Sequence, residues 1–300
     1  MTSALPQLPR IGVPPIKCQG IKTKLVPFIL SHITWQETPN ATWIEPFLGS
    51  GVVAFNRLPD RAVLADTNPH IIGFYRAIQQ GKIDRVSVQN FLAEEGEILQ
   101  QHGAEYYYTV RDRFNRDHSP LDFLFLNRAC FNGLMRFNSK GQFNVPFCRK
   151  PQRFSQSYIT KISNQVSWVA QCMTGKDWKF RVADWAEILQ EAQPNDFVYL
   201  DPPYIGRHAD YHNQWNLEDA EKLAAIAQQL PCDFAVSMWL ENRHRKNDHI
   251  QQCWSNLDVR THQHFYHVGS HESLRSAMTE ALIIKPGDKP TSQKDFCIAF

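Results

Sequence analysis

The sequence predicts an α/β fold in which a second, mainly helical domain with a β-hairpin is inserted into the sheet domain. Three observations predict this fold. Short apolar runs of strand length alternate with segments of helical spacing. A glycine turn follows the first run, and the alternation stops between residues 69 and 156. Strands that alternate with helices are typical of a sheet covered by helices.

The first half of the predicted sheet domain contains a glycine turn between two strands. The apolar run 42–46 leads into a turn with Gly49 and Gly51, and a segment that can open a helix follows. The next apolar run ends in Asp66. Strand, glycine turn and helix, followed by a strand with an acidic end, are typical of nucleotide-binding units, in which the acid binds a ribose hydroxyl.

The second half continues the alternation. The run Phe197–Leu200 leads into the motif Asp201-Pro202-Pro203-Tyr204, and Asn216 can cap a helix that ends before Pro231. Two further runs, Phe234–Ser237 and Ala281–Ile284, are expected to be strands. Uninterrupted apolar runs indicate strands that are buried on both faces.

The inserted segment has a different pattern. Helical spacing occurs at Ile71–Ile78, Phe91–Leu99 and Phe123–Arg128, and Ser139–Gln142 is a hairpin turn between Phe137 and Phe143. We therefore expect a catalytic domain formed by residues 1–68 and 157–300, and a recognition domain formed by residues 69–156.

Charge is distributed unevenly along the chain. The formal net charge is only +2, from 32 basic and 30 acidic residues. The stretch from Phe123 to Lys176 nevertheless contains no acid and eight cations, which are Arg128, Arg136, Lys140, Arg149, Lys150, Arg153, Lys161 and Lys176. Cations interleaved with aromatic residues favour a polyanion with stackable bases. The insertion is thus a candidate nucleic-acid reader on a mildly acidic scaffold.

Several function classes are not expected. No apolar run is long enough for a membrane helix, residues 1–15 lack a secretory signal, and the seven cysteines form no C-x-x-C pair. We expect a cytoplasmic protein without a membrane partner. Four histidines between 262 and 271 suggest a metal site, but no H-E-x-x-H or carboxylate pattern accompanies them, so we expect no metal.

The motif Asp201–Tyr204 can hold an amino group on a planar ring. Its carboxylate and its backbone carbonyls accept hydrogen bonds, the prolines remove two backbone donors, and the tyrosine provides a flat face. When these groups accept hydrogen bonds from both N–H groups of an exocyclic amine, they favour a nitrogen whose lone pair can attack a sulfonium methyl. Orientation and electrostatics would then supply the catalysis without a covalent intermediate.

Taken together, the motifs resemble those of the Dam-like DNA adenine-N6 methyltransferases, in the same order along the chain. The matching segments are Ile16–Lys22, Glu45–Gly51, Leu64–Asn68, Leu126–Arg128, Asn132–Leu134, Arg136, Gly141–Phe147 and Asp201–Tyr204. The resemblance implies a Rossmann-like, S-adenosylmethionine-dependent methyltransferase sheet with a target-recognition insertion. It implies catalysis by Asp201, Pro202 and Tyr204, the last of which would stack on an adenine flipped from the duplex.

The resemblance also implies contacts to both substrates. S-adenosylmethionine would be bound by Cys18, Lys22, Glu45, Phe47, Gly49, Gly51, Asp66, Asp184 and Asp201. Double-stranded DNA would be bound by Arg128, Phe131, Asn132, Leu134, Arg136, Lys140, Pro146 and Arg149. Within this set Phe131 would fill the opened helix, and Asn132, Leu134, Arg136 and Pro146 would meet base edges.

The resemblance makes GATC the expected target, and another short target is left open. The choice between an orphan enzyme and a restriction–modification enzyme is left open as well. We expect a monomer in solution, with a dimer on DNA and a cognate restriction endonuclease that makes no direct contact as further options.

The chain departs from the family pattern at several positions. Cys18 stands where Trp is common, Ile21 stands where Gly is common, and Ser237-Met238-Trp239 replaces a pattern that often contains Asn. The region 262–278 has no assigned role. An RNA or cytosine-N4 methyltransferase and a DNA-binding protein without catalysis are the alternatives. Cytosine-N4 enzymes more often carry Ser at the position of Asp201, and a pure DNA-binding protein has no need of the glycine turn.

Overall fold

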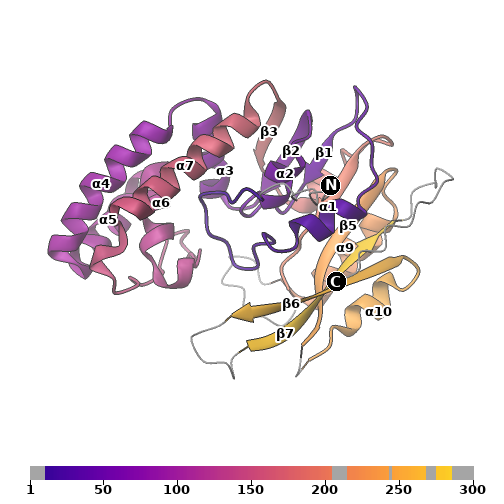
Figure 1. The fold of residues 1–300 in the computed structure, drawn as a ribbon. Coiled ribbons are helices and arrows are strands. Elements are labelled where there is room, and N and C mark those ends of the chain that lie inside the picture. The colour runs from indigo at the N-terminus through magenta and orange to yellow at the C-terminus, as the bar shows by residue number, and fades with distance from the viewer. Residues whose placement is uncertain (1–10, 205–214, 243–244, 268–274, 286–300) are drawn as a thin grey trace, which may run out of the picture.

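A seven-stranded sheet forms the centre of the molecule (Figure 1). The computed structural model describes residues 11–204, 215–242, 245–267 and 275–285. The strands are β1 (Trp43–Glu45), β2 (Arg61–Asp66), β3 (Asp177–Val182), β4 (Phe197–Leu200), β5 (Asp233–Asn242), β6 (Asp258–His267) and β7 (Arg275–Ile284). Their order is β3-β2-β1-β4-β5-β7-β6, in which β7 is antiparallel to both its neighbours and the other pairs are parallel. The predicted α/β class is confirmed.

The sheet order reverses between β1 and β4. The chain runs outward from β1 to β2 and β3 on one side, and from β4 to β5 on the other. The carboxyl ends of β1 and β4 therefore meet at a topological switch point, where sheets of this kind bind ligands. Glu45 ends β1 and Asp201 follows β4, so both carboxyl groups are placed at that point.

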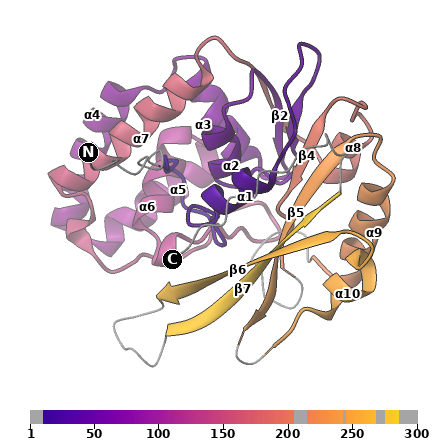
Figure 2. The same cartoon turned by 45° about the vertical axis from the view of Figure 1, so that its right-hand side comes forward.

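Both faces of the sheet are covered, because alternate residues of each central strand enter different cores. In β4, Phe197 and Tyr199 belong to one core, and Val198 and Leu200 belong to the other. Helices α1 (Val26–His32), α2 (Val52–Arg57), α3 (Pro69–Gln79) and α7 (Gln156–Met173) contribute to the first core. Helices α8 (Trp185–Leu189), α9 (Leu217–Gln228) and α10 (Asp248–Trp254) contribute to the second, on the opposite side in Figure 2.

The predicted glycine turn joins β1 to α2. Gly49 and Gly51 have φ angles of +50° and +69°, in the left-handed region that glycine tolerates best. A β-carbon on Gly51 would lie 2.6 Å from the ring of Phe55. The backbone N–H of Leu48 donates to the carbonyl of Ala65 on β2, which fixes the turn beside the neighbouring strand.

The insertion is mainly helical, as predicted, and it lies to one side of the sheet in both views (Figures 1 and 2). The expected helical segments lie within α3, α4 (Arg85–His102) and α6 (Pro120–Ala129), and α5 (Ala104–Asp117) was not foreseen. The expected hairpin is present, with bridges between Phe137 and Phe143 and between Cys130 and Phe147. Helix α7 packs along α4, so sheet domain and insertion share an extensive contact. The boundaries at 69 and 156 remain a prediction.

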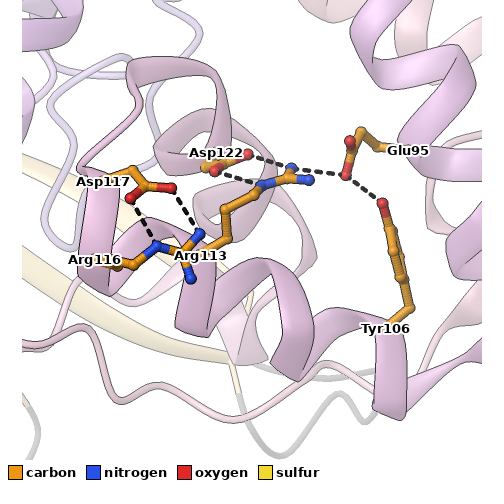
Figure 3. A network of polar contacts seen from close by, with 6 residues as sticks. All are labelled: Glu95, Tyr106, Arg113, Arg116, Asp117 and Asp122. Atoms are coloured by element: carbon orange, nitrogen blue, oxygen red, sulfur yellow. Dashed lines mark hydrogen bonds and ion pairs between the residues drawn. The ribbon is translucent and has the colours of Figure 1, made fainter.

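One guanidinium joins three helices of the insertion (Figure 3). Arg113 on α5 donates to both oxygens of Asp122 on α6, at 2.9 and 2.6 Å, and to Glu95 on α4 at 3.0 Å. Tyr106 donates to the same Glu95 oxygen at 2.8 Å. Asp122 and Glu95 are buried, so removal of Arg113 would leave two carboxylates without their cation. The network fixes the spacing of the helices that carry the hairpin.

No helix in the described ranges is long and apolar enough to cross a bilayer. Among the same residues, no group of three or more His, Cys, Asp or Glu side chains is placed to hold a metal ion. Of the four histidines noted in the sequence, His262 lies on β6 and packs against Phe28 of α1 with ring centroids 4.9 Å apart. His271 lies outside the described residues.

Candidate active site

Asp201 lies at the centre of the candidate site and uses one of its two oxygens for binding to the protein. Its Oδ1 accepts a hydrogen bond from Lys22 Nζ at 2.7 Å and one from Ser237 Oγ at 3.0 Å. Ser237 on β5 is itself within 2.9 Å of the Tyr199 hydroxyl. Within the described part of the chain, no protein group is bonded to Oδ2. That oxygen is therefore available to accept a hydrogen bond from a substrate.

Lys22 is a buried cation between acidic groups. Its side chain is 3% exposed, and Nζ also donates to the carbonyl of Gly20 at 3.1 Å. Burial lowers the pKa of Lys22, but the attraction of Asp201, reinforced by Tyr204 and Glu280, outweighs it and raises the pKa well above its ordinary value. Lys22 therefore stays protonated and fixes the orientation of the Asp201 carboxylate.

Tyr204 packs beneath the same lysine. Lys22 Nζ lies 5.0 Å from the centroid of the Tyr204 ring, within the range of a cation–π contact. The Tyr204 hydroxyl donates to Glu280 Oε2 at 2.8 Å. Burial raises the pKa of Tyr204, so the phenol remains a neutral donor. Pro202, the third predicted catalytic residue, is buried between Asp201 and Tyr204 in the chain.

Cys18 lies beside the glycine turn, although the family commonly has Trp at this position. A β-carbon on Gly49 would lie 3.7 Å from Cys18 Sγ. Burial, together with the charges of Asp66 and Asp201, raises the pKa of the thiol well above its ordinary value. Cys18 is thus a neutral side chain beside the predicted glycine turn.

Glu45 is a buried carboxyl group at the end of β1. Its Oε1 accepts from Trp43 Nε1 at 2.8 Å. Burial raises the pKa of Glu45 to about 8; the Trp43 bond opposes this shift and the nearby charge of Asp201 adds to it. At neutral pH the group is therefore largely protonated.

Asp66 connects the end of β2 to the glycine turn. Its Oδ2 accepts from the backbone N–H of Gly49 at 2.9 Å, and its Oδ1 accepts from that of Asn68 at 2.8 Å. Burial raises the pKa of Asp66, and these two hydrogen bonds oppose the shift. Asp66 thus has a structural role at the position where a ribose-binding acid was predicted.

Aromatic side chains flank the site on its α8 side. Phe47 lies 6.3 Å from the ring centroid of Trp185 and 5.6 Å from that of Trp215, with an edge-on geometry to the latter. The two tryptophans were not predicted as site residues. Asp184, another predicted cofactor contact, is exposed and caps α8 by accepting a hydrogen bond from the Ala186 N–H at 2.9 Å.

The hairpin brings most of the predicted DNA-binding residues together. Phe131 is 51% exposed, and its backbone N–H donates to the carbonyl of Pro146 at 2.8 Å. Pro146 is also an exposed residue. Asn132 is exposed with a φ of +53°, and Leu134 follows it half-buried. Phe131, Asn132 and Pro146 thus project from one end of the hairpin.

The predicted cations of the insertion lie in different environments. Arg136 is half-buried, and its Nε donates to Asn144 Oδ1 at 2.8 Å across the hairpin. Lys140 and Arg149 are exposed, and Lys140 lines a pocket of about 390 Å³ beside α3. Arg128 is only 4% exposed and donates to Gln165 Oε1 at 2.6 Å. The structure does not bring Arg128 to the surface with the others.

A doubly wound sheet with a glycine turn and acidic groups at the carboxyl ends of β1, β2 and β4 is typical of Rossmann-like folds. The family model of the D12 class N6 adenine-specific DNA methyltransferases matches residues 19–270, which is most of the chain. The chain therefore belongs to this family, and it is an adenine-specific DNA methyltransferase.

Individual relatives support the same assignment. The chain is 31% identical over 238 residues to the DNA adenine methylase of Serratia marcescens, a match that covers 76% of this chain and 82% of that protein. It is 30% identical over 209 residues to the type II methyltransferase M.MjaIII of Methanocaldococcus jannaschii, a match that covers 64% of this chain and 68% of that protein. It is 27% identical over 292 residues to the type II methyltransferase M1.LlaDCHI of Lactococcus lactis subsp. cremoris, a match that covers 91% of this chain and 95% of that protein. The resemblance to Dam-like enzymes is confirmed.

Proposed function

We propose that this methyltransferase transfers a methyl group from S-adenosylmethionine to N6 of an adenine that it flips out of a short duplex target. The arrangement of Lys22, Asp201 and Tyr204 is the observation that supports this proposal most directly. A fixed carboxylate with one unused oxygen lies beside a tyrosine ring, as an exocyclic amine on a planar base requires. Flipping is needed because the amine of a paired base is not accessible inside the duplex.

The carboxylates around the switch point fit S-adenosylmethionine. When bound, this cofactor supplies a methyl group on a positively charged sulfur. Glu45 and Asp201 would lie near its cationic groups, and Asp66 would accept its ribose hydroxyls through lone pairs that its two backbone bonds leave unused. Gly49 and Gly51 allow close approach of the backbone. Cys18, Lys22, Phe47 and Asp184 complete the proposed set.

Asp201 and Pro202 would activate the target amine. Asp201 Oδ2 and the carbonyl of Pro202 accept hydrogen bonds from the two N–H groups of N6. This arrangement directs the nitrogen lone pair toward the methyl group. S-adenosylmethionine would supply the methyl group to N6 and leave as a neutral thioether, and the surplus proton of N6 would pass to Asp201 or to water. The ring of Tyr204 stacks on the adenine and keeps it in the plane that this attack requires.

The insertion would select the target on double-stranded DNA. We propose that Phe131 occupies the space left in the opened helix, that Asn132, Leu134, Arg136 and Pro146 read base edges, and that Lys140 and Arg149 contact phosphates. Arg128 would act from behind this surface, because it is buried. GATC is the proposed target. The relatives include proteins named DNA adenine methylase and type II methyltransferase. Both an orphan role and a restriction–modification role are consistent with these names.

Sequencing native DNA from a host that expresses the enzyme tests the whole proposal. We expect N6-methyladenine at a single short palindromic motif, and no such signal in a host that expresses Asp201→Asn. Modified cytosine in place of methyladenine, or DNA without any added methylation, would overturn it. Methyladenine at a motif other than GATC would correct the target alone.

A further inference from the structure

Glu280 is a buried carboxylate of the site that no sequence motif indicates. It lies on β7, opposite Trp239 of β5 and His262 of β6 in the ladder, and is only 2% exposed. Its Oε2 accepts the hydrogen bond from the Tyr204 hydroxyl at 2.8 Å. A residue of the fixed sheet therefore holds a residue of the loop that follows β4.

This hydrogen bond acts on the part of Tyr204 that stacking does not require. Stacking on a base uses the aromatic ring alone, and every base offers a π face. The hydroxyl can therefore serve to orient the ring. Since Glu280 lies on a strand paired on both sides, its carboxylate fixes the direction in which that hydroxyl points, and with it the plane of the ring.

The cost of burying Glu280 argues that the carboxylate has a function. A buried carboxylate is stabilising only when partners compensate its desolvation, and an apolar residue of similar size often serves stability as well or better. Its neighbours Met278 and Leu282 on β7 are both buried and apolar. The charge of Glu280 also contributes to the raised pKa of Lys22, which connects it to Asp201.

We propose that Glu280 is a positioning residue that fixes the Tyr204 ring in the plane against which the target adenine stacks. This proposal rests on the proposed function. Glu280 would act, through Tyr204, on the adenine after it has been flipped. Loss of Glu280 should therefore lower kcat and the ordering of the flipped base while leaving cofactor affinity unchanged.

Four variants test the proposal. Glu280→Leu removes the acceptor, Glu280→Gln keeps an acceptor oxygen without the charge, Tyr204→Phe removes the donor, and Tyr204→Phe is combined with Glu280→Leu. Thr279→Val is the matched control, because Thr279 is the adjacent buried polar residue of β7. Each protein is assayed for kcat and KM on duplex DNA and for the fluorescence of 2-aminopurine at the target position. Cofactor affinity is measured by calorimetry, and thermal unfolding identifies variants that fail to fold.

We expect Glu280→Leu and Tyr204→Phe each to lower kcat at least tenfold, and the double variant to be no slower than the slower single variant. Glu280→Gln should stay within about threefold of the unmodified enzyme, and Thr279→Val should match it. Additive losses in the double variant, or a Glu280→Gln as slow as Glu280→Leu, would overturn the positioning role. If the unmodified enzyme does not methylate adenine, the proposed function itself fails; if it does and Glu280→Leu is equally fast, only this inference fails.

Discussion

The side-chain amide of Asn127 exchanges two hydrogen bonds with the backbone of Lys17: it accepts from the Lys17 N–H at 2.8 Å and donates to the Lys17 carbonyl at 2.9 Å. Asn127 is fully buried on α6 of the insertion, and Lys17 precedes Cys18 in the segment that leads to Lys22. One side chain thus connects the insertion, which we propose reads DNA, to the segment that carries the proposed cofactor contacts.

Asn127→Ala should destabilise the protein and weaken the use of DNA. Loss of the amide leaves the N–H and the carbonyl of Lys17 without their partner, which costs about 1–3 kcal/mol of folding free energy. Because the insertion is then less firmly held, we expect a higher KM for DNA. Urea unfolding and steady-state kinetics on duplex DNA measure the two effects.

Asn56→Ala is the matched control for this variant. Asn56 on α2 exchanges the same pair of hydrogen bonds with the backbone of Gly12, at 2.9 and 3.0 Å, but it does not belong to the insertion. We expect a similar loss of stability without the rise in KM for DNA. Equal changes in KM for both variants would show that the Asn127 bond serves stability alone.

The sheet could be predicted from the sequence where its strands are buried on both faces. The expected run Phe197–Leu200 coincides with β4, and Asp66 ends β2 as expected. β6 escaped prediction because it is an edge strand with polar residues and therefore forms no apolar run. Helix α5 is rich in charged and polar residues, so its helical spacing was hidden in the same way.

The candidate site was predictable only in part, for a related reason. Asp201 and Tyr204 belong to a short motif whose chemistry can be read from neighbouring residues. Ser237 and Glu280 approach them through strand pairing between β4, β5 and β7, which no local pattern specifies. The only available signal for Ser237 was the departure from the family pattern after β4, and that signal did not reveal its hydrogen bond to Asp201.

Cofactor-free protein should lose stability as the pH rises from about 4.5 to about 8. The pKa of Glu45 is raised from 4.5 in the unfolded chain to about 8 in the folded protein. The folded state therefore holds the proton more tightly, and this stabilisation is complete below pH 4.5 and is lost as the pH approaches 8. Each pH unit within this window costs up to about 1.4 kcal/mol.

Glu45→Gln should flatten this dependence, because the amide does not titrate. Thermal unfolding of the cofactor-free protein between pH 5.5 and 8 measures the slope. Glu97→Gln, which changes an exposed residue of α4 instead, is the control and should leave the slope as it is. An equally steep slope in Glu45→Gln would show that other groups cause the pH dependence.

Asp201→Asn should abolish methyl transfer while DNA binding is retained. The amide keeps the shape of the side chain, but it cannot present two acceptor oxygens to Lys22 and to a target amine. We expect kcat to fall at least about 100-fold, comparable to the loss of one preorganised group that stabilises a transition state. Transfer of a tritiated methyl group measures turnover, and fluorescence anisotropy measures binding to labelled duplex. Turnover within tenfold of the unmodified enzyme would contradict the assigned role of Asp201.

Arg136 and Arg149 should differ in what they contribute to DNA recognition. Arg136 is held across the hairpin by Asn144. We propose that it contacts a guanine edge, an interaction worth about 1–3 kcal/mol when it is bidentate. Arg149 is exposed and is proposed to contact a phosphate. Arg136→Ala should relax discrimination at one base pair of the target, whereas Arg149→Ala should weaken binding on all sequences and reduce its salt dependence. Methylation rates on a set of duplexes, each with one substituted base pair, separate the two effects. A uniform loss on all duplexes for Arg136→Ala would instead assign it to the DNA backbone.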